Sequence, residues 1–116
     1  MLITRRMDFS ASYRDPSGAV HGHNWELEVT LRGSVNPDTG MVIDLKDLKE
    51  IMEREVEARF DHRSLNDDTA YFREQPPSPE SLARLIFSLL DKALPDGSLH
   101  RVRLSPTRDL TVEVER

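Results

Sequence analysis

The sequence predicts an α+β domain in which two strands are followed by two helices and then by two more strands. Three observations lead to this prediction. Apolar and polar residues alternate near both ends of the chain, apolar residues recur at helical spacing in the middle, and no repeat or linker divides the 116 residues. A chain of this length has the usual size of one domain and can bury a core. We therefore expect residues 1–116 to form one domain with the order ββααββ.

The first two strands are predicted by alternation with a period of two. Residues 3–13 place four side chains of the core type on one face: Met7, Phe9, Ala11 and Tyr13. The second strand follows a loop and places six side chains on one face: His21, His23, Trp25, Leu27, Val29 and Leu31. Because alternate residues of a strand share a face, each strand should be buried on one side only.

The two helices are marked by their N-caps. Asp44 precedes apolar residues at helical spacing and should cap a helix that extends to about Arg59. Ser78, with Pro79 at the first helical position, should begin a second helix that ends before Pro95.

The remaining segments complete the predicted order. Residues 61–77 are polar and form a long connection of the kind that often carries function. Alternation around residues 102–104 and 110–114 predicts the last two strands, joined by a turn at residues 106–109.

Composition excludes several classes of function. The chain has no cysteine, so any bound metal must use nitrogen and oxygen ligands. The net charge is −5 and the arginines are scattered, which argues against a nucleic-acid partner. No stretch approaches the roughly 18 apolar residues of a membrane span, and the N-terminus lacks a signal-peptide run. We therefore expect a cytoplasmic protein with no membrane partner.

The pair His21 and His23 is the first candidate site. Two imidazoles two residues apart on a strand lie on the same face with overlapping reach, which suits a borderline metal such as zinc. Gly22 between them allows another backbone to approach closely. The alternative is that backbone carbonyls or water satisfy both histidines, and the spacing alone does not decide.

Two further candidates carry acidic groups. Asp61 and His62 place a carboxylate beside an imidazole in a loop, where histidine can act as a general base near neutral pH. The alternative is a surface pair, since adjacent residues need not contact each other. Glu80 lies in the first turn of the second helix, where it could equally serve the helix dipole.

In combination, these motifs resemble a known family. The matching segments, in order, are Phe9-Ser10-Ala11-Ser12, His21-Gly22-His23-Asn24-Trp25, Gly40-Met41-Val42, Phe60-Asp61-His62 with Leu65-Asn66, Pro79-Glu80, and Val102-Arg103-Leu104 leading to Thr107. They resemble the 6-pyruvoyl-tetrahydropterin synthases and their bacterial relatives, the 6-carboxytetrahydropterin synthases of queuosine biosynthesis. The resemblance implies a T-fold: an antiparallel four-stranded sheet with two helices on one face, three copies forming a barrel, and two trimers forming a hexamer.

The resemblance also implies a chemistry. Family members bind a small pterin-type substrate, 7,8-dihydroneopterin triphosphate, and eliminate triphosphate on the way to tetrahydrobiopterin or queuosine. A zinc ion held by three histidines acts there as a Lewis acid. Carried over by position, two residues are implied as zinc ligands, His21 and His23; two as the proton relay, Asp61 and His62; and two as pterin-pocket residues, Glu80 and Thr107.

Three positions depart from the family pattern. Tyr13 stands where the first zinc histidine is expected, and tyrosine is a poor ligand because its unperturbed pKa is about 10. Ser17 stands in place of the cysteine of the bacterial branch, and Pro106 in place of the glutamate that grips the pterin. Asp15, in the loop after the first strand, could supply a third metal ligand.

These departures leave two functions open. One is a diverged zinc-dependent lyase; the other is a non-catalytic or altered-substrate paralogue that binds a pterin or a purine. In both cases we expect His21 and His23 to lie on one side of their strand, within reach of Tyr13. We also expect a homo-oligomer, a hexamer built as a dimer of trimers, because assembly would close the sheet edges.

Overall fold

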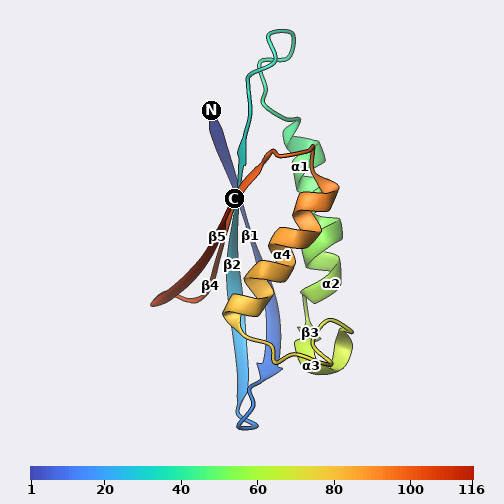
Figure 1. The fold of residues 1–116 in the computed structure, drawn as a ribbon, viewed down its shortest axis with the longest axis vertical. Helices are drawn as coiled ribbons and strands as arrows, with labels where there is room; N and C mark the ends of the chain where they lie inside the picture. The colour runs from blue at the N-terminus through green and yellow to red at the C-terminus, as the bar shows by residue number, and fades with distance from the viewer.

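The computed structural model describes residues 1–116 and contains a five-stranded sheet with the long helices α1 and α4 on one face (Figure 1). The strands, in the order β3-β1-β2-β4-β5, are β1 (Leu2–Arg14), β2 (Val20–Arg32), β3 (Arg63–Ser64), β4 (Leu99–Thr107) and β5 (Leu110–Glu115). The helices are α1 (Leu45–Met52), η1 (Glu53–Glu57), α2 (Ala58–Phe60), α3 (Leu65–Asp68) and α4 (Pro79–Ala93). The predicted α+β class is confirmed, and so is the order of the four long strands and the two main helical segments.

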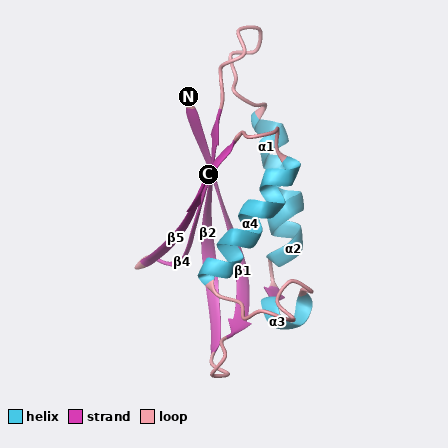
Figure 2. Ribbon diagram, viewed as in Figure 1, coloured by secondary structure: helices cyan, strands magenta, loops and turns pink.

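The core lies between the sheet and the helices. Trp25 is fully buried, and its ring stacks against Phe9 with centroids 6.1 Å apart. Its indole Nε1 donates to the carbonyl oxygen of Ala11 at 3.1 Å, so the buried polar atom has a partner. Figure 2 shows the opposite face of the sheet without a helical cover. One-sided burial is therefore the physical origin of the alternation in β1 and β2.

The first helical segment differs from the prediction of one regular helix. A five-residue π-helical turn, η1, separates α1 from α2. We attribute this turn to the spacing of the buried side chains. Four of them lie four residues apart: Leu48, Met52, Val56 and Phe60. This spacing exceeds the 3.6 residues of an α-helical turn, and a wider π turn keeps all four on the core face.

Helix α4 begins as predicted. The Ser78 hydroxyl accepts a hydrogen bond from the backbone N–H of Ser81, and the Ser81 hydroxyl accepts one from the backbone N–H of Ser78. Pro79 occupies the first turn, where its missing N–H is not needed. This cap fixes the start of α4 and with it the position of Glu80.

The sequence did not predict β3, which adds a fifth strand to the four long ones. This two-residue strand pairs parallel with β1, Ala11 opposite Arg63 and Ser12 opposite Ser64. Two residues are too few to show an alternation. The polar connection also contains α3, capped by the Ser64 hydroxyl, which accepts from the backbone N–H of Asp67.

The β1–β2 hairpin extends past the ends of β4 and β5 (Figure 1). Strand β2 pairs with β4 only from Glu26 onward, so residues 20–25 have no partner strand on that side. Along its outer side β1 pairs with β3 at two positions only. The sheet therefore presents unpaired edges on both sides of the hairpin. No helix has the length and apolar composition needed to cross a membrane.

Candidate functional site

The end of the β1–β2 hairpin gathers four polar side chains on the helix-facing side of the sheet, here called the hairpin cluster: Tyr13, Asp15, His21 and His23. Tyr13 pairs with His21 across the two strands, and their rings stack with centroids 4.9 Å apart and an interplanar angle of 19°. The ring centroids of His21 and His23 are 6.3 Å apart. The two imidazoles thus share one face beside Tyr13, as the alternation predicts.

Asp15 is fixed by the loop that joins the two strands. Its Oδ1 accepts hydrogen bonds from the backbone N–H of Ser17 (2.9 Å), the hydroxyl of Ser17 (2.5 Å) and the backbone N–H of Ala19 (3.1 Å). Its Oδ2 lies 2.8 Å from Nε2 of His21. The hydroxyl of Ser17, followed by His21, holds the pKa of the Asp15 carboxyl well below its usual range, so this group is an anion at neutral pH.

Burial affects the other two rings of the cluster. Desolvation, followed by the neighbouring His21, lowers the pKa of His23, which favours the neutral imidazole that a metal requires. Desolvation, followed by the charges of Glu80 and Asp15, raises the pKa of Tyr13. Its phenol therefore stays protonated at neutral pH and is a poor metal ligand.

Asp61 and His62, here called the edge pair, lie beside β1 at the start of β3. Asp61 Oδ1 accepts from the backbone N–H of Ser10 at 2.8 Å, and the backbone N–H of His62 donates to the carbonyl oxygen of Ser10 at 2.6 Å. Asp61 Oδ2 lies 2.9 Å from Nδ1 of His62, whose side chain is 82% exposed. The two side chains are therefore in contact, although the imidazole lies at the surface.

The backbone of His62 is unusual. Its φ of 59° lies in the left-handed region, which is unfavourable for a residue with a Cβ and occurs at functional sites more often than elsewhere. The Ser10 N–H, and then His62 itself, lower the pKa of the Asp61 carboxyl, so Asp61 is an anion that orients the imidazole. The Nε2 atom of His62 has no hydrogen-bond partner within the chain and is free to exchange a proton.

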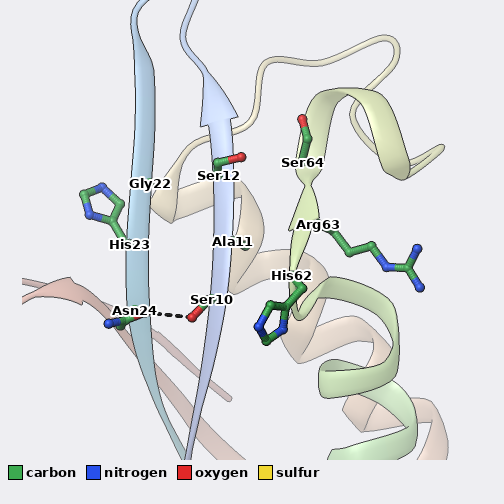
Figure 3. A pocket seen from close by; sticks show the side chains of 9 residues that line it. All are labelled: Ser10, Ala11, Ser12, Gly22, His23, Asn24, His62, Arg63 and Ser64. Carbon is green, nitrogen blue, oxygen red and sulfur yellow. Dashed lines mark hydrogen bonds between the residues drawn. The ribbon is translucent and has the colours of Figure 1, made fainter.

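The hairpin cluster and the edge pair are not in contact within one chain. Both His23 and His62 line a surface hollow of about 450 Å³, together with residues of β1 and β3. Figure 3 shows His23 on the outer side of β2 and His62 beyond β1, with the His62 ring turned toward β1. One implied zinc ligand, His23, and one residue of the implied proton relay, His62, therefore line the same hollow from different sides of the hairpin.

The two implied pterin-pocket residues are also apart. Glu80 lies at the start of α4, and its charge acts on Tyr13. Thr107 is exposed at the end of β4 and lines a different hollow, of about 360 Å³, with Asn24 and Arg108. The structure thus associates Glu80 with the hairpin cluster but does not bring Thr107 there.

Two of the three departures, Ser17 and Pro106, have visible structural surroundings. The Ser17 hydroxyl is engaged by Asp15 at 2.5 Å, so it is not a free base. Pro106 is buried where the β4–β5 pairing shifts register, a position that needs no N–H donor. It offers no carboxylate to a ligand.

Sequence reasoning missed two residues that hold the edge region in place. Ser10 anchors the edge pair through both backbone groups, and its hydroxyl donates to Asn24 Oδ1 at 2.7 Å. The Asn66 side chain accepts from the backbone N–H of Arg14 at 2.7 Å and donates to the carbonyl oxygen of Arg14 at 3.2 Å. Both segments were recognised as motifs, but the partners lie more than fifty residues apart and leave no local signal.

In this structure no three His, Asp or Glu side chains lie close enough together to hold a metal ion. The donor chemistry nevertheless fits zinc at the hairpin cluster, because two imidazoles and a carboxylate are an established zinc ligand set. Tyr13 does not fit, since its phenol keeps its proton.

Comparison with known proteins gives the family. Residues 3–116 match the family model described as 6-pyruvoyl tetrahydropterin synthase. The chain is 36% identical over 124 residues to 6-pyruvoyl tetrahydrobiopterin synthase of Homo sapiens, covering 90% of this chain and 84% of the human one. It is 38% identical over 120 residues to a putative 6-carboxy-5,6,7,8-tetrahydropterin synthase of Archaeoglobus fulgidus, covering 100% and 96%.

A solved structure agrees with these sequence matches. The structure of Caenorhabditis elegans 6-pyruvoyl tetrahydropterin synthase superposes with a TM-score of 0.91 at 27% identity, covering 100% of this chain and 95% of that one. The chain belongs to the 6-pyruvoyl tetrahydropterin synthase family, and its fold is the T-fold that the motifs implied.

Proposed function

We propose that this protein is a zinc-dependent lyase that eliminates triphosphate from 7,8-dihydroneopterin triphosphate. The observation that carries the proposal is the geometry of His21 and His23, two imidazoles on one strand face, in a chain whose relatives are named as tetrahydropterin synthases. The low pKa of His23 supports a neutral, metal-binding ring.

In this proposal His21 and His23 hold the zinc ion. When bound, zinc polarises the oxygens of the substrate side chain and acidifies the adjacent C–H bond. His62 accepts and returns the proton through its free Nε2, because Asp61 holds the opposite ring nitrogen, Nδ1, at 2.9 Å. Glu80 and Thr107 bind the pterin ring.

Assembly is part of the same proposal. A homo-oligomer, a hexamer of two trimers, would pair the free edges of β1 and β2 with strands of neighbouring copies. Light scattering tests this step, and a monomer at working concentration would contradict it.

A second candidate is an altered-substrate or non-catalytic protein that binds a pterin or a purine. It is favoured by the engaged hydroxyl of Ser17 and by the buried Pro106, which remove the expected base and the expected ring anchor. A lost charge-assisted pair of hydrogen bonds would weaken pterin binding by about tenfold to a hundredfold.

One experiment separates the two candidates. The purified protein with added zinc is incubated with 7,8-dihydroneopterin triphosphate, and released triphosphate and the pterin product are measured. Stoichiometric triphosphate release supports the lyase, and the chromatographic identity of the product distinguishes a pyruvoyl from a carboxy product. Without release, a rise in melting temperature with a pterin or a purine supports the second candidate, since a ligand that binds only the folded state stabilises it.

A further inference from the structure

The loop between β1 and β2 presents one carboxylate oxygen to the histidine pair. Asp15 Oδ1 is occupied by three donors from Ser17 and Ala19, which fixes the orientation of the carboxylate. Its Oδ2 has a single hydrogen-bond partner, Nε2 of His21, at 2.8 Å. The loop therefore holds one oxygen in a defined position beside an imidazole nitrogen.

We propose that Asp15 is the third protein ligand of a mixed nitrogen–oxygen metal site with His21 and His23. This inference rests on the metal-binding part of the proposed function and specifies its ligand set. The occupant is a borderline divalent cation such as Zn²⁺, since two imidazoles with one carboxylate form a known zinc set that leaves a fourth position for water or substrate.

Two pairs of the three proposed ligands lie near the spacing that a zinc ion requires. Two donors on a tetrahedral zinc ion are roughly 3.4 Å apart, given bonds of about 2.0–2.1 Å. The Asp15 and His21 atoms, at 2.8 Å, must therefore separate by roughly half an ångström. Two imidazoles on one zinc ion have centroids roughly 5 Å apart, so the 6.3 Å between His21 and His23 must close by roughly 1 Å.

The phenol oxygen of Tyr13 is the alternative third ligand. The contacts of Tyr13 indicate a different role. Its ring packs against the flat side of the His21 ring, with an angle of 19° between the planes. This contact limits the ring orientations of His21 but does not need the phenol oxygen. The Asp15 carboxylate, by contrast, places an oxygen 2.8 Å from Nε2 of His21.

The most direct test uses the absence of cysteine from the chain. Asp15→Cys places a single thiol at the proposed ligand position, and the matched control Ser12→Cys places one on the opposite face of β1. With Co²⁺ bound, a coordinating thiolate gives a sulfur-to-metal charge-transfer band in the near ultraviolet. We expect this band in Asp15→Cys and not in Ser12→Cys. Its absence from Asp15→Cys, in a folded variant that still binds Co²⁺, would overturn the inference.

Affinity provides the second measurement. Zn²⁺ affinity is measured by competition with a chromophoric chelator for the wild type, Asp15→Asn and Tyr13→Phe, with circular dichroism as the folding control. We expect Asp15→Asn to weaken binding by more than the roughly 10–100-fold typical of an outer partner of a ligand, and Tyr13→Phe to change it by less than about threefold. The reverse order would assign the oxygen ligand to Tyr13 and overturn the inference.

The outcome for the wild type separates this inference from the proposed function. If the wild type binds zinc through His21 but Asp15→Asn binds equally well, only the role of Asp15 fails. If the wild type binds no stoichiometric zinc, both the ligand set and the zinc dependence of the proposed function fail.

Discussion

The hairpin cluster and the edge pair both combine histidine with aspartate, yet they are built in different ways. The hairpin cluster lies within eleven residues of sequence, and the alternation of two adjacent strands determines its shared face. The edge pair depends on Ser10, 51 residues away, which binds the side chain of Asp61 and the backbone of His62. A local pattern can therefore bring two imidazoles to one face, whereas the orientation of the His62 imidazole depends on the completed fold.

The largest expected effect is a difference in zinc content between a variant of the hairpin cluster and a variant of the edge pair. His21→Ala should abolish zinc binding, because it removes a ligand from a site with few donors. His62→Ala should keep its zinc but lose about 10²–10⁴-fold in turnover, as expected for a general base. Elemental analysis and triphosphate release measure the two effects. Equal zinc content in His21→Ala and the wild type would show that the hairpin cluster is not the metal site.

A smaller effect concerns the left-handed backbone of His62. Because φ is 59°, a Cβ is unfavourable there by about 1–2 kcal/mol relative to glycine. His62→Gly should therefore be more stable to denaturant than His62→Ala, although both lack the imidazole. Equal midpoints of urea unfolding would show that the backbone at the edge pair is not strained. At His21 the order should reverse, because this strand position has no left-handed φ and glycine within a strand costs about 0.5–1 kcal/mol relative to alanine.

The comparison also explains how much the sequence could predict. Alternation and the caps at Asp44 and Ser78 were sufficient for the four long strands and for the start of each long helix. The strand β3 and the π turn η1 were not predicted, because a two-residue pairing and a change of helical pitch depend on packing in the finished fold.

The candidate site was predictable to a similar extent. The common face of His21 and His23 followed from their spacing, and the contact of His21 with Asp15 is a short-range one. The position of the edge pair beside the hairpin, and of Thr107 in a different hollow, could not be read from the sequence, because both depend on how distant strands are arranged.

The pH dependence of stability should sharpen the role of Asp61. Its pKa is lower in the folded state than the value of about 3.9 in the unfolded chain. The ionised carboxylate therefore contributes stability that is fully present above about pH 4 and is lost as the pH falls through the folded pKa. For a partly exposed group we expect less than about 1 kcal/mol. Urea unfolding of the wild type and Asp61→Asn from pH 7 to pH 2 should show a difference that shrinks only at acidic pH, and a difference independent of pH would contradict the role of the charge.

The smallest expected effect connects α4 to the hairpin cluster. The charge of Glu80 helps to raise the pKa of Tyr13, after burial. Glu80→Gln removes this charge and should lower that pKa, because the phenolate is then repelled less. The chain has two tyrosines, so ultraviolet titration of Glu80→Gln is compared with the wild type, and Tyr13→Phe identifies the signal of Tyr71. An unchanged titration of Tyr13 would mean that Glu80 lies too far from the cluster to act on it or on a ligand bound there.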